Sequence, residues 1–236
     1  MTVTQEALLH SGKANDVYAT GNENFLIINH SDRISAGNGV KTDVISGKGK
    51  SNNAVSELVF NLLEKVGVKT HFVERYSDTA MVIKKADMIL LEVICRNKTW
   101  GSFCKRYECS KGIIISPAGV EFCLKDDALG DPFMPVWAIT TLGYATAEEV
   151  TLIEQFIRKS NDVMLELFGK LGLELIDFKL EFGRLKDGSI VVCDEISLDT
   201  CRLIDNKTGQ NLDKDRFRND LGGVKEAYTE VLNRLK

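Results

Sequence analysis

The sequence predicts an α+β protein, and three observations carry that prediction. Residues 173–202 alternate apolar and polar side chains around an Asp-Gly pair, which is typical of a β-hairpin. Two longer segments, 146–171 and 224–235, place apolar side chains at helical spacing. Short apolar runs of strand length fill much of the chain before residue 125, so strands and helices both contribute to the core.

The composition is that of an ordinary globular protein. The 236 residues suffice for one large domain or two small lobes, with 44% hydrophobic and 27% charged residues. A net charge of −4 without a basic block argues against a nucleic-acid partner. The first residues lack a secretory signal pattern, and no apolar run has the length of a membrane helix. We therefore expect a cytoplasmic protein with no membrane partner.

Cysteines and histidines give no pattern of a metal site. The six cysteines contain no CxxC pair and match no zinc module, and the three histidines are widely separated. Most of the cysteines lie in apolar, strand-like contexts, which indicates reduced thiols that pack as small hydrophobic residues. A zinc site or a catalytic thiol is the alternative interpretation.

The N-terminal segment predicts strands joined by tight turns. Residues 8–30 read as two strands, with turns at Gly12-Lys13 and at residues 21–24. A Gly-Lys turn can cover nucleotide phosphates, because glycine permits close approach and lysine supplies charge; it can equally be an ordinary surface turn. Residues 31–50 are rich in Gly, Ser, Asn and Lys and predict a long loop, which is either an ordinary connection or a functional loop.

The middle of the chain predicts one helix followed by strands. Residues 53–66 form the helix, with Asn52 or Asn53 as its N-cap and Gly67 at its end. Residues 71–75 and 80–84 read as strands, and residues 88–96 as a fully buried strand. The crossover at residues 85–88 is the expected lobe boundary.

Beyond the predicted buried strand, the sequence predicts a basic segment, a hairpin and two helices. Residues 97–106 form a basic stretch that is either an ordinary loop or a binding segment for an anionic substrate. Residues 112–115 and 120–124 predict another hairpin. Thr146 and Glu149 form a capping box that begins a helix ending at Gly172, and residues 224–235 form a C-terminal amphipathic helix.

The hairpin at residues 173–202 carries two carboxylates that its register brings together. If Asp187 and Gly188 form a two-residue type I′ turn, Glu181 lies directly opposite Asp194. Facing carboxylates repel, and Mg²⁺ between them would remove the repulsion. Lys179 lies on the same face and suits a phosphate or carboxylate. The alternative is a solvated strand face on which the lysine screens two acids.

Seven segments, in order and spanning nearly the whole chain, resemble phosphoribosylaminoimidazole-succinocarboxamide (SAICAR) synthetases. They are SGKANDVY (11–18), RISAGNGVKTDVISGKG (33–49), LLEVICRNKTWGSFCKR (90–106), VEFCLKDDALGDP (120–132), LIDFKLEFG (175–183), CDEISLDTCRLID (193–205) and LDKDRFRNDLG (212–222).

The resemblance implies a ligase that uses ATP to join carboxyaminoimidazole ribotide (CAIR) and L-aspartate. The products are SAICAR, ADP and phosphate, with an acyl phosphate as intermediate. The implied fold has two lobes: a small β-rich lobe at residues 1–86, resembling the kinase small lobe, and a larger α+β, ATP-grasp-like lobe at residues 87–236. The first lobe covers ATP and the second carries the metal and CAIR sites. The family's bacterial members imply a homodimer.

The resemblance also implies roles for individual positions. Lys179, Glu181 and Asp194 match catalytic positions, and the two acids among them match the Mg²⁺ ligands. Positions that resemble the ATP site are Gly12, Lys13, Val17, Lys84, Met88 and Lys125. Positions that resemble the CAIR and aspartate site are Arg96, Ser102, Asp177, Lys179, Asp199, Arg202 and Arg218. Asp131 lies in a motif that lines the family's cleft.

Two positions depart from the family's pattern. Asn15 stands where the glycine turn usually carries a second basic residue, which removes one charge near the phosphates. Leu198 replaces a proline and frees the backbone before Asp199. Two alternatives stay open: a related ATP-dependent ligase or small-molecule kinase, and a nucleotide-binding regulatory protein without catalysis. The carboxylate pair and Lys179 argue against the second alternative.

Overall fold

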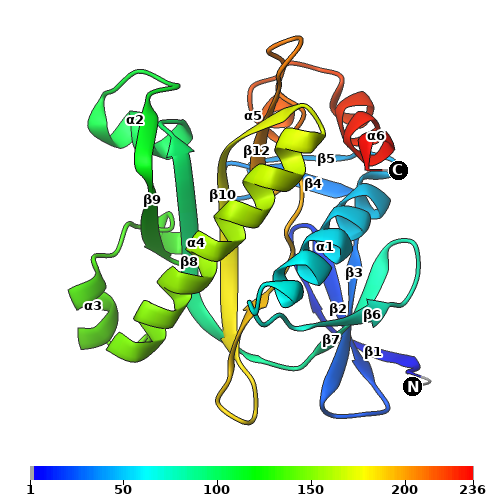
Figure 1. Ribbon diagram of the computed structural model, residues 1–236. Coiled ribbons are helices and arrows are strands. Elements are labelled where there is room, and N and C mark those ends of the chain that lie inside the picture. Colours follow the sequence, from blue (N-terminus) through cyan, green and yellow to red (C-terminus); the bar gives the residue numbers. More distant parts are fainter. Residues whose placement is uncertain (1–2, 236) are drawn as a thin grey trace.

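The computed structural model describes residues 3–235, and its first layer is a five-stranded antiparallel sheet (Figure 1). The strands pair in the order β1-β2-β3-β7-β6. Their bounds are β1 Gln5–Ser11, β2 Asn15–Thr20, β3 Phe25–His30, β6 Phe72–Arg75 and β7 Ala80–Lys84. A separate hairpin, β4 (Arg33–Ala36) with β5 (Lys41–Val44), lies between β3 and the first helix in the chain.

The second sheet is built on two long central strands, β8 and β10, which pair antiparallel. Strand β9 pairs with β8, whereas β11 and β12 pair with opposite halves of β10. The bounds are β8 Asp87–Lys98, β9 Ile114–Leu124, β10 Leu173–Arg184, β11 Ile190–Cys193 and β12 Cys201–Asp205. The two sheets meet beside Thr70, which forms an isolated parallel bridge with Val192.

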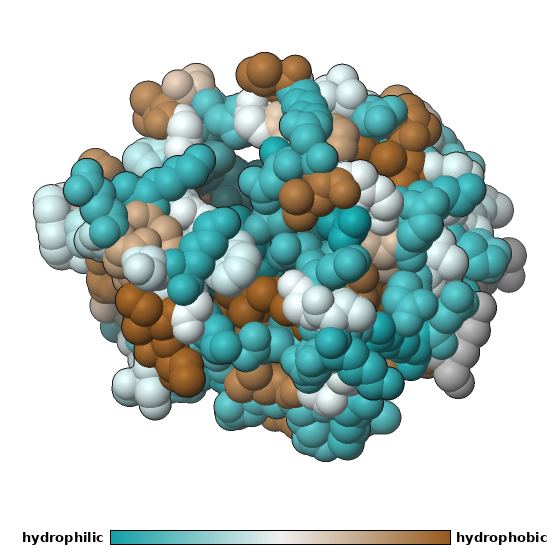
Figure 2. Space-filling view, turned by 90° about the horizontal axis from the view of Figure 1, so that it is seen from above, coloured by the Kyte–Doolittle hydropathy of each residue, from teal (hydrophilic) through white to brown (hydrophobic). Residues whose placement is uncertain are grey.

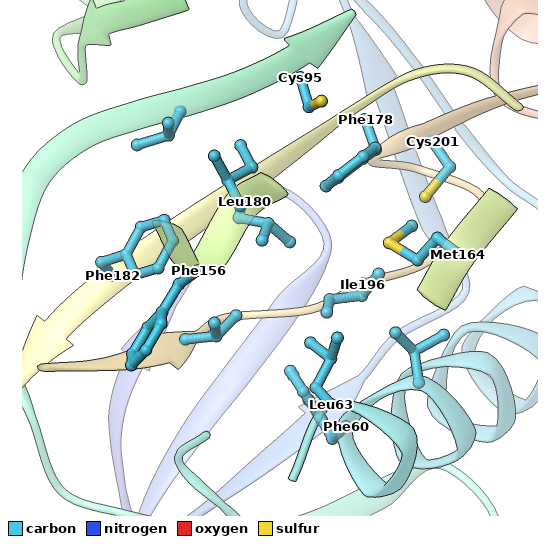
Figure 3. Packing of buried hydrophobic residues seen from close by; sticks show 14 of the residues in the cluster. Phe60, Leu63, Cys95, Phe156, Met164, Phe178, Leu180, Phe182, Ile196 and Cys201 are labelled. Carbon is cyan, nitrogen blue, oxygen red and sulfur yellow. The ribbon is translucent and has the colours of Figure 1, made fainter. Parts of the chain in front are cut away.

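Helices cover the sheets and close the larger of two hydrophobic clusters. The long helix α4 (Ala147–Lys170) crosses the second sheet, and α1 (Lys48–Lys65) lies beside it (Figure 1). Aromatic and aliphatic side chains from α1, α4 and β10 interlock there, including Phe60, Phe156 and Phe178 (Figure 3). The remaining helices are α2 Gly101–Tyr107, η1 Asp127–Leu129, α3 Val136–Thr141, α5 Asp215–Arg218 and α6 Val224–Arg234.

Several predicted elements are confirmed. The capping box holds, because the Thr146 hydroxyl accepts from the Glu149 backbone while the Glu149 carboxylate accepts from that of Thr146. Helix α6 and strands β6, β7 and β8 lie where the pattern placed them. Four cysteines pack in strands as small buried residues, as predicted: Cys95, Cys123, Cys193 and Cys201.

The predicted start of the first helix is wrong by about one turn. Helix α1 begins at Lys48, after Gly47 in a left-handed conformation with φ 86°. The capping acceptor comes from elsewhere in the chain, because the Asp32 carboxylate accepts from the backbone N–H groups of Gly47 and Gly49. Asn52, predicted as a possible cap, is instead buried inside the helix and donates to Glu195.

Five other expectations are corrected. Residues 8–30 form three strands, not two, and the predicted loop 31–50 contains the β4-β5 hairpin and the start of α1. The basic stretch 97–106 includes most of helix α2. Residues 114–124 form one strand, not a hairpin, because they pair with β8 over most of its length. Strand β8 is only partly buried, since Met88 is 40% and Leu90 51% exposed.

The predicted hairpin register is wrong by one residue. Lys186, Asp187 and Gly188 form a three-residue loop, because the Leu185 N–H donates to the Ser189 carbonyl at 2.9 Å. Gly188 has a φ of 80°, and Asp187 is not in the left-handed region that a type I′ turn requires. Glu181 therefore pairs with Cys193, and Asp194 follows the end of β11.

The predicted lobe boundary falls between the two sheets, after β7 and before β8. One hydrophobic cluster includes residues on both sides of it, among them Ile83 and Ile89. The division at residues 86 and 87 remains a proposal. Among the described residues, no helix combines the length and apolar character needed to span a membrane.

Candidate active site

A single cavity of about 1230 Å³ runs between the two sheets. Seen from above, the molecule has a hollow bordered mainly by hydrophilic residues (Figure 2). All fifteen positions that the sequence nominated for catalysis or binding line this cavity, although they come from distant parts of the chain. They are Gly12, Lys13, Val17, Lys84, Met88, Arg96, Ser102, Lys125, Asp177, Lys179, Glu181, Asp194, Asp199, Arg202 and Arg218.

The part of the cavity beside the first sheet is apolar. Strands β2, β3, β7 and β8 contribute Val17, Leu26, Ile28, Ile83, Met88 and Leu90 to its wall. Lys84, at the end of β7, donates through Nζ to the Thr70 carbonyl at 3.1 Å. Such a wall with few polar groups suits a flat heterocycle.

The turn between β1 and β2 reaches toward the second sheet. Its backbone is closed by the Gly12 N–H, which donates to the Asn15 carbonyl at 2.8 Å. Lys13 Nζ lies 2.5 Å from Asp127 Oδ1, and both side chains are substantially exposed. The Lys13 charge is therefore at the mouth of the cavity. An exposed ion pair of this kind contributes little free energy, so Lys13 can exchange Asp127 for another anion.

Glu181 and Asp194, with the lysines beside them, form what we call the carboxylate-pair end. Glu181 on β10 accepts from Lys179 Nζ at 2.6 Å and from Lys125, and Lys179 also donates to Glu92 at 2.8 Å. Burial opposes ionisation of Glu181, but Lys179 and Lys125 outweigh it and lower the Glu181 pKa to about 2. Glu181 is therefore a fixed negative charge.

Asp194 has the opposite character. It adopts a left-handed conformation with φ 58° as the chain leaves β11. Burial, and then the charge of Glu181, raise the Asp194 pKa to about 7. The two acids thus interact strongly, although they are not cross-strand partners.

The chemistry of this pair fits Mg²⁺ shared with a phosphate group. Two hard oxygen donors whose charges repel are relieved by a divalent cation. Within residues 3–235, no group of three or more His, Cys, Asp or Glu side chains is placed to hold a metal. Because Mg²⁺ usually takes one or two carboxylates together with substrate phosphates and water, two protein ligands suffice.

Arg96, Arg202 and Arg218 form what we call the arginine end. Arg96 is almost fully buried, and its guanidinium donates to Glu121 at 2.7 Å, to Asp177 at 2.9 Å and to the Ser102 hydroxyl at 3.0 Å. Three acceptors around one planar group fix its orientation.

Arg202 links the same network to helix α5. It donates to Asp177 at 2.8 Å and to Asp215 at 3.0 Å. Burial disfavours its charge, but these two aspartates outweigh that effect and raise the Arg202 pKa. Arg218 donates to the other oxygen of Asp215 at 2.7 Å. Gly101 has a φ of 55°, which L side chains rarely adopt, and a Cβ there would lie 2.6 Å from the Arg202 guanidinium, which would have to move.

Sequence reasoning missed a buried polar layer beneath the carboxylates. The Asn15 amide nitrogen lies 3.4 Å from both Asp194 and Glu195, and its oxygen lies 3.0 Å from His30 Nδ1. Because Asn15 Nδ2 faces two carboxylates, its Oδ1 must accept, which places the proton on His30 Nδ1. Asn52 donates to Glu195 at 3.1 Å.

A second missed group surrounds Asp199. This carboxylate accepts from fully buried Lys48 at 2.7 Å and from the Tyr228 hydroxyl at 2.5 Å. Burial opposes ionisation, but Lys214 and Lys48 outweigh it and lower the Asp199 pKa to about 2. The available signal was Gly47-Lys48-Gly49, a lysine between glycines inside the stretch predicted to be a loop.

Comparisons with known proteins agree on one family. The family model described as SAICAR synthetase matches residues 8–235. A phosphoribosylaminoimidazole-succinocarboxamide synthase from Finegoldia magna is 46% identical over 228 residues, which are 97% of this chain and 98% of that protein.

Solved structures give the same result. The crystal structure of a synthase of that name from Ehrlichia chaffeensis has a TM-score of 0.94 and 38% identity, covering 97% of this chain and 98% of the other. A SAICAR synthetase in complex with ADP has a TM-score of 0.92 and 39% identity, covering 96% and 97%. The two-lobed α+β fold expected from the resemblance is therefore confirmed, and the chain belongs to the SAICAR synthetase family of ligases.

Proposed function

We propose that this protein joins CAIR and L-aspartate in an ATP-dependent reaction that yields SAICAR, ADP and phosphate. The observation that carries the proposal is that every position nominated from sequence for either substrate lines one cavity. A cavity lined by an apolar wall beside the first sheet, by two acids and by three guanidinium groups suits a nucleotide facing an anionic ribotide.

In this assignment, the nucleotide occupies the space beside the first sheet. Val17, Lys84 and Met88 border the base, while Gly12, Lys13 and Lys125 lie near the phosphates. The structure of a relative in complex with ADP supports a nucleotide site in the family. Glu181 and Asp194 would hold Mg²⁺, which supplies positive charge to the phosphate oxygens when it is bound.

CAIR occupies the arginine end. Arg96, Arg202 and Arg218, with the Ser102 hydroxyl, offer charge-assisted donors to its phosphate or carboxylate. Asp177 and Asp199 lie close enough to this group to accept from ribotide hydroxyls or to orient the arginines, and Asp177 already does the latter.

The reaction then needs positioning and charge stabilisation more than covalent help from the protein. A CAIR carboxylate oxygen attacks the γ-phosphorus of ATP, the bond to the β-phosphate oxygen breaks, and ADP leaves. The aspartate amine next attacks the acyl carbon, phosphate departs with the C–O bonding pair, and the amine loses a proton. Lys179 stays charged, because Glu181 and Glu92 outweigh burial and raise its pKa, so it can stabilise negative charge on the transferring group.

The proposal also covers the oligomeric state and the role of each lobe. We propose a homodimer, which light scattering on the purified protein would test directly. We also propose that residues 1–86 act as the lobe over ATP, and that residues 87–236 carry the metal and ribotide groups.

The experiment that tests the function is ADP release from ATP, measured with CAIR in the presence and absence of L-aspartate. We expect sustained ADP release and formation of SAICAR only when both substrates are present. Other amines should not replace L-aspartate. Steady ADP release with an unrelated acceptor, and none with CAIR, would identify a different ligase or kinase and overturn the proposal.

A further inference from the structure

Lys214 is a cavity-lining cation that the assignments above leave without a role. It immediately precedes helix α5, and its backbone N–H donates to the Leu198 carbonyl at 3.1 Å. That bond fixes Lys214 beside the loop that carries Asp199. The side chain is half-buried and lines the same cavity as the carboxylate pair.

The other lysines and arginines of the cavity wall each already have an acceptor within the protein. The acceptor is a carboxylate in every case except Lys84, which donates to a carbonyl; the cations are Lys13, Lys84, Arg96, Lys125, Lys179, Arg202 and Arg218. Within the described part of the chain, Lys214 is the exception, because its ammonium group makes no hydrogen bond or ion pair.

The acidic groups whose charges act on Lys214 are already engaged. Asp199 accepts from Lys48 and Tyr228, and Glu195 accepts from Asn52. Burial lowers the pKa of Lys214 despite the charges of Asp199 and Glu195, as expected for a buried ammonium group that donates to no protein acceptor. Its Nζ is also not among the fully buried unpaired atoms, so it can be reached from the cavity.

We propose that Lys214 binds a carboxylate of the amino-acid substrate. The inference rests on the proposed function. It assigns one residue to L-aspartate, for which no separate binding residue is named above. L-Aspartate brings two carboxylates into a cavity whose other lysines and arginines each already donate to a protein acceptor. An ammonium group with three free donors supplies both the charge and the hydrogen bonds that one of these carboxylates needs.

Its position suits the chemistry. The charges that act on Lys214 include Glu195, next to the carboxylate pair, and Arg218, at the arginine end. A carboxylate held on Lys214 would keep the substrate amine inside the cavity that also contains the carboxylate pair and the arginines. Lys214 would thus select an amine substrate that carries carboxylates over one that carries none.

Steady-state kinetics of Lys214→Met, Lys214→Arg and the control Lys225→Met test the proposal; Lys225 is exposed on α6. In Lys214→Met we expect the KM for L-aspartate to rise about ten- to a hundredfold, as for a lost charge-assisted hydrogen bond. The KM values for CAIR and ATP should change by less than about twofold, whereas a general loss of structure would move all three. Lys214→Arg should recover part of the loss.

Amine analogues sharpen the result. L-Asparagine lacks the side-chain carboxylate of aspartate, and aspartic acid α-amide lacks the other one. Wild type should use both analogues less efficiently than L-aspartate. In Lys214→Met, the difference in efficiency between L-aspartate and one of the two analogues should largely disappear. Unchanged discrimination in both Lys214 variants, or a rise in KM for CAIR instead of aspartate, would overturn the assignment. Failure of wild type to make SAICAR would instead refute the proposed function.

Discussion

The carboxylate-pair end and the arginine end of the cavity hold their charges in opposite ways. At the arginine end, Glu121, Asp177 and Asp215 accept short hydrogen bonds from Arg96, Arg202 and Arg218. At the other end, burial and Glu181 raise the pKa of Asp194 to about 7. One end is compensated by the protein alone, whereas the other carries a negative charge that the protein does not fully balance.

The difference teaches which part of the site is preformed. The arginine end is fixed by side chains that hold one another, so it needs little rearrangement to receive an anion. The carboxylate-pair end becomes favourable only when a cation enters. We therefore expect the binding of Mg²⁺ and ATP to depend on the carboxylate-pair end. The affinity for CAIR should depend on the arginine end.

The largest expected effect comes from removing the charge of Asp194. We expect Asp194→Asn to melt at or above the wild-type temperature without ligand, because it relieves repulsion with Glu181. It should lose nearly all the stabilisation that Mg·ATP gives wild type. A ligand stabilises a protein only by binding its folded state, and this variant should no longer bind Mg·ATP well. Turnover should fall by about two to three orders of magnitude.

Thermal melts with and without Mg·ATP, together with steady-state rates, check this prediction. Asp162→Asn, an exposed change on α4, is the matched control. If Asp194→Asn were still stabilised by Mg·ATP as strongly as wild type, the metal role of Asp194 would be refuted.

The next effect concerns the arginine end. Arg202→Ala should raise the KM for CAIR by about ten- to a hundredfold, because a charge-assisted hydrogen bond is worth about 1.5–3 kcal/mol. Ser102→Ala should act in the same direction but less, since its hydroxyl is neutral. ATP affinity should change much less in both variants. Kinetics against each substrate decide the point, with exposed Arg158→Ala as control; equal losses for CAIR and ATP would contradict the placement.

A pH effect tests how completely the arginine end is compensated. Asp213 lies behind it, and burial, followed by the charge of Asp215, raises the Asp213 pKa from 3.8 to about 6. The folded state therefore holds this proton more tightly than the unfolded state does. Between about pH 4 and pH 6, the group should cost stability progressively, by roughly 1–3 kcal/mol in total.

The measurement is the free energy of unfolding of wild type and Asp213→Asn across this pH range. The asparagine cannot titrate, so wild type should lose stability relative to the variant as the pH rises. Asp187→Asn, in the exposed hairpin loop, is the control. A difference between the two proteins that stays constant with pH would mean that Asp213 is ionised throughout.

The smallest effect is expected at Asn15. Asn15→Lys would place a cation near Asp194 and Glu195, where Asn15 now lies 3.4 Å from each carboxylate. We expect the variant to be tolerated and to bind ATP severalfold more tightly, which titration calorimetry with Mg·ATP would measure. Asn15→Gln keeps the residue neutral and controls for side-chain length. Weaker ATP binding by the lysine variant would show that the turn runs differently beside the phosphates.

Sequence patterns predicted the elements whose stability is local. The capping box at Thr146, the apolar face of α6 and the apolar runs of β6 to β8 depend on neighbours a few residues away. Boundaries set by distant groups were missed. Helix α1 begins where Asp32 caps it, and β9 is continuous because β8 pairs with it.

The sequence by itself determined the family, the α+β fold and the identity of the charged residues in the site, because seven ordered segments specify them together. Only the tertiary structure decided how their charges are balanced. The one-residue register shift removed the predicted cross-strand pairing of Glu181 with Asp194, yet burial still couples the two acids. Asn52 and Lys214 give no local signal of their surroundings, and the glycines on either side of Lys48 do not indicate which carboxylate it meets. Whether a lysine or amide finds a partner depends on which distant carboxylates the fold brings beside it.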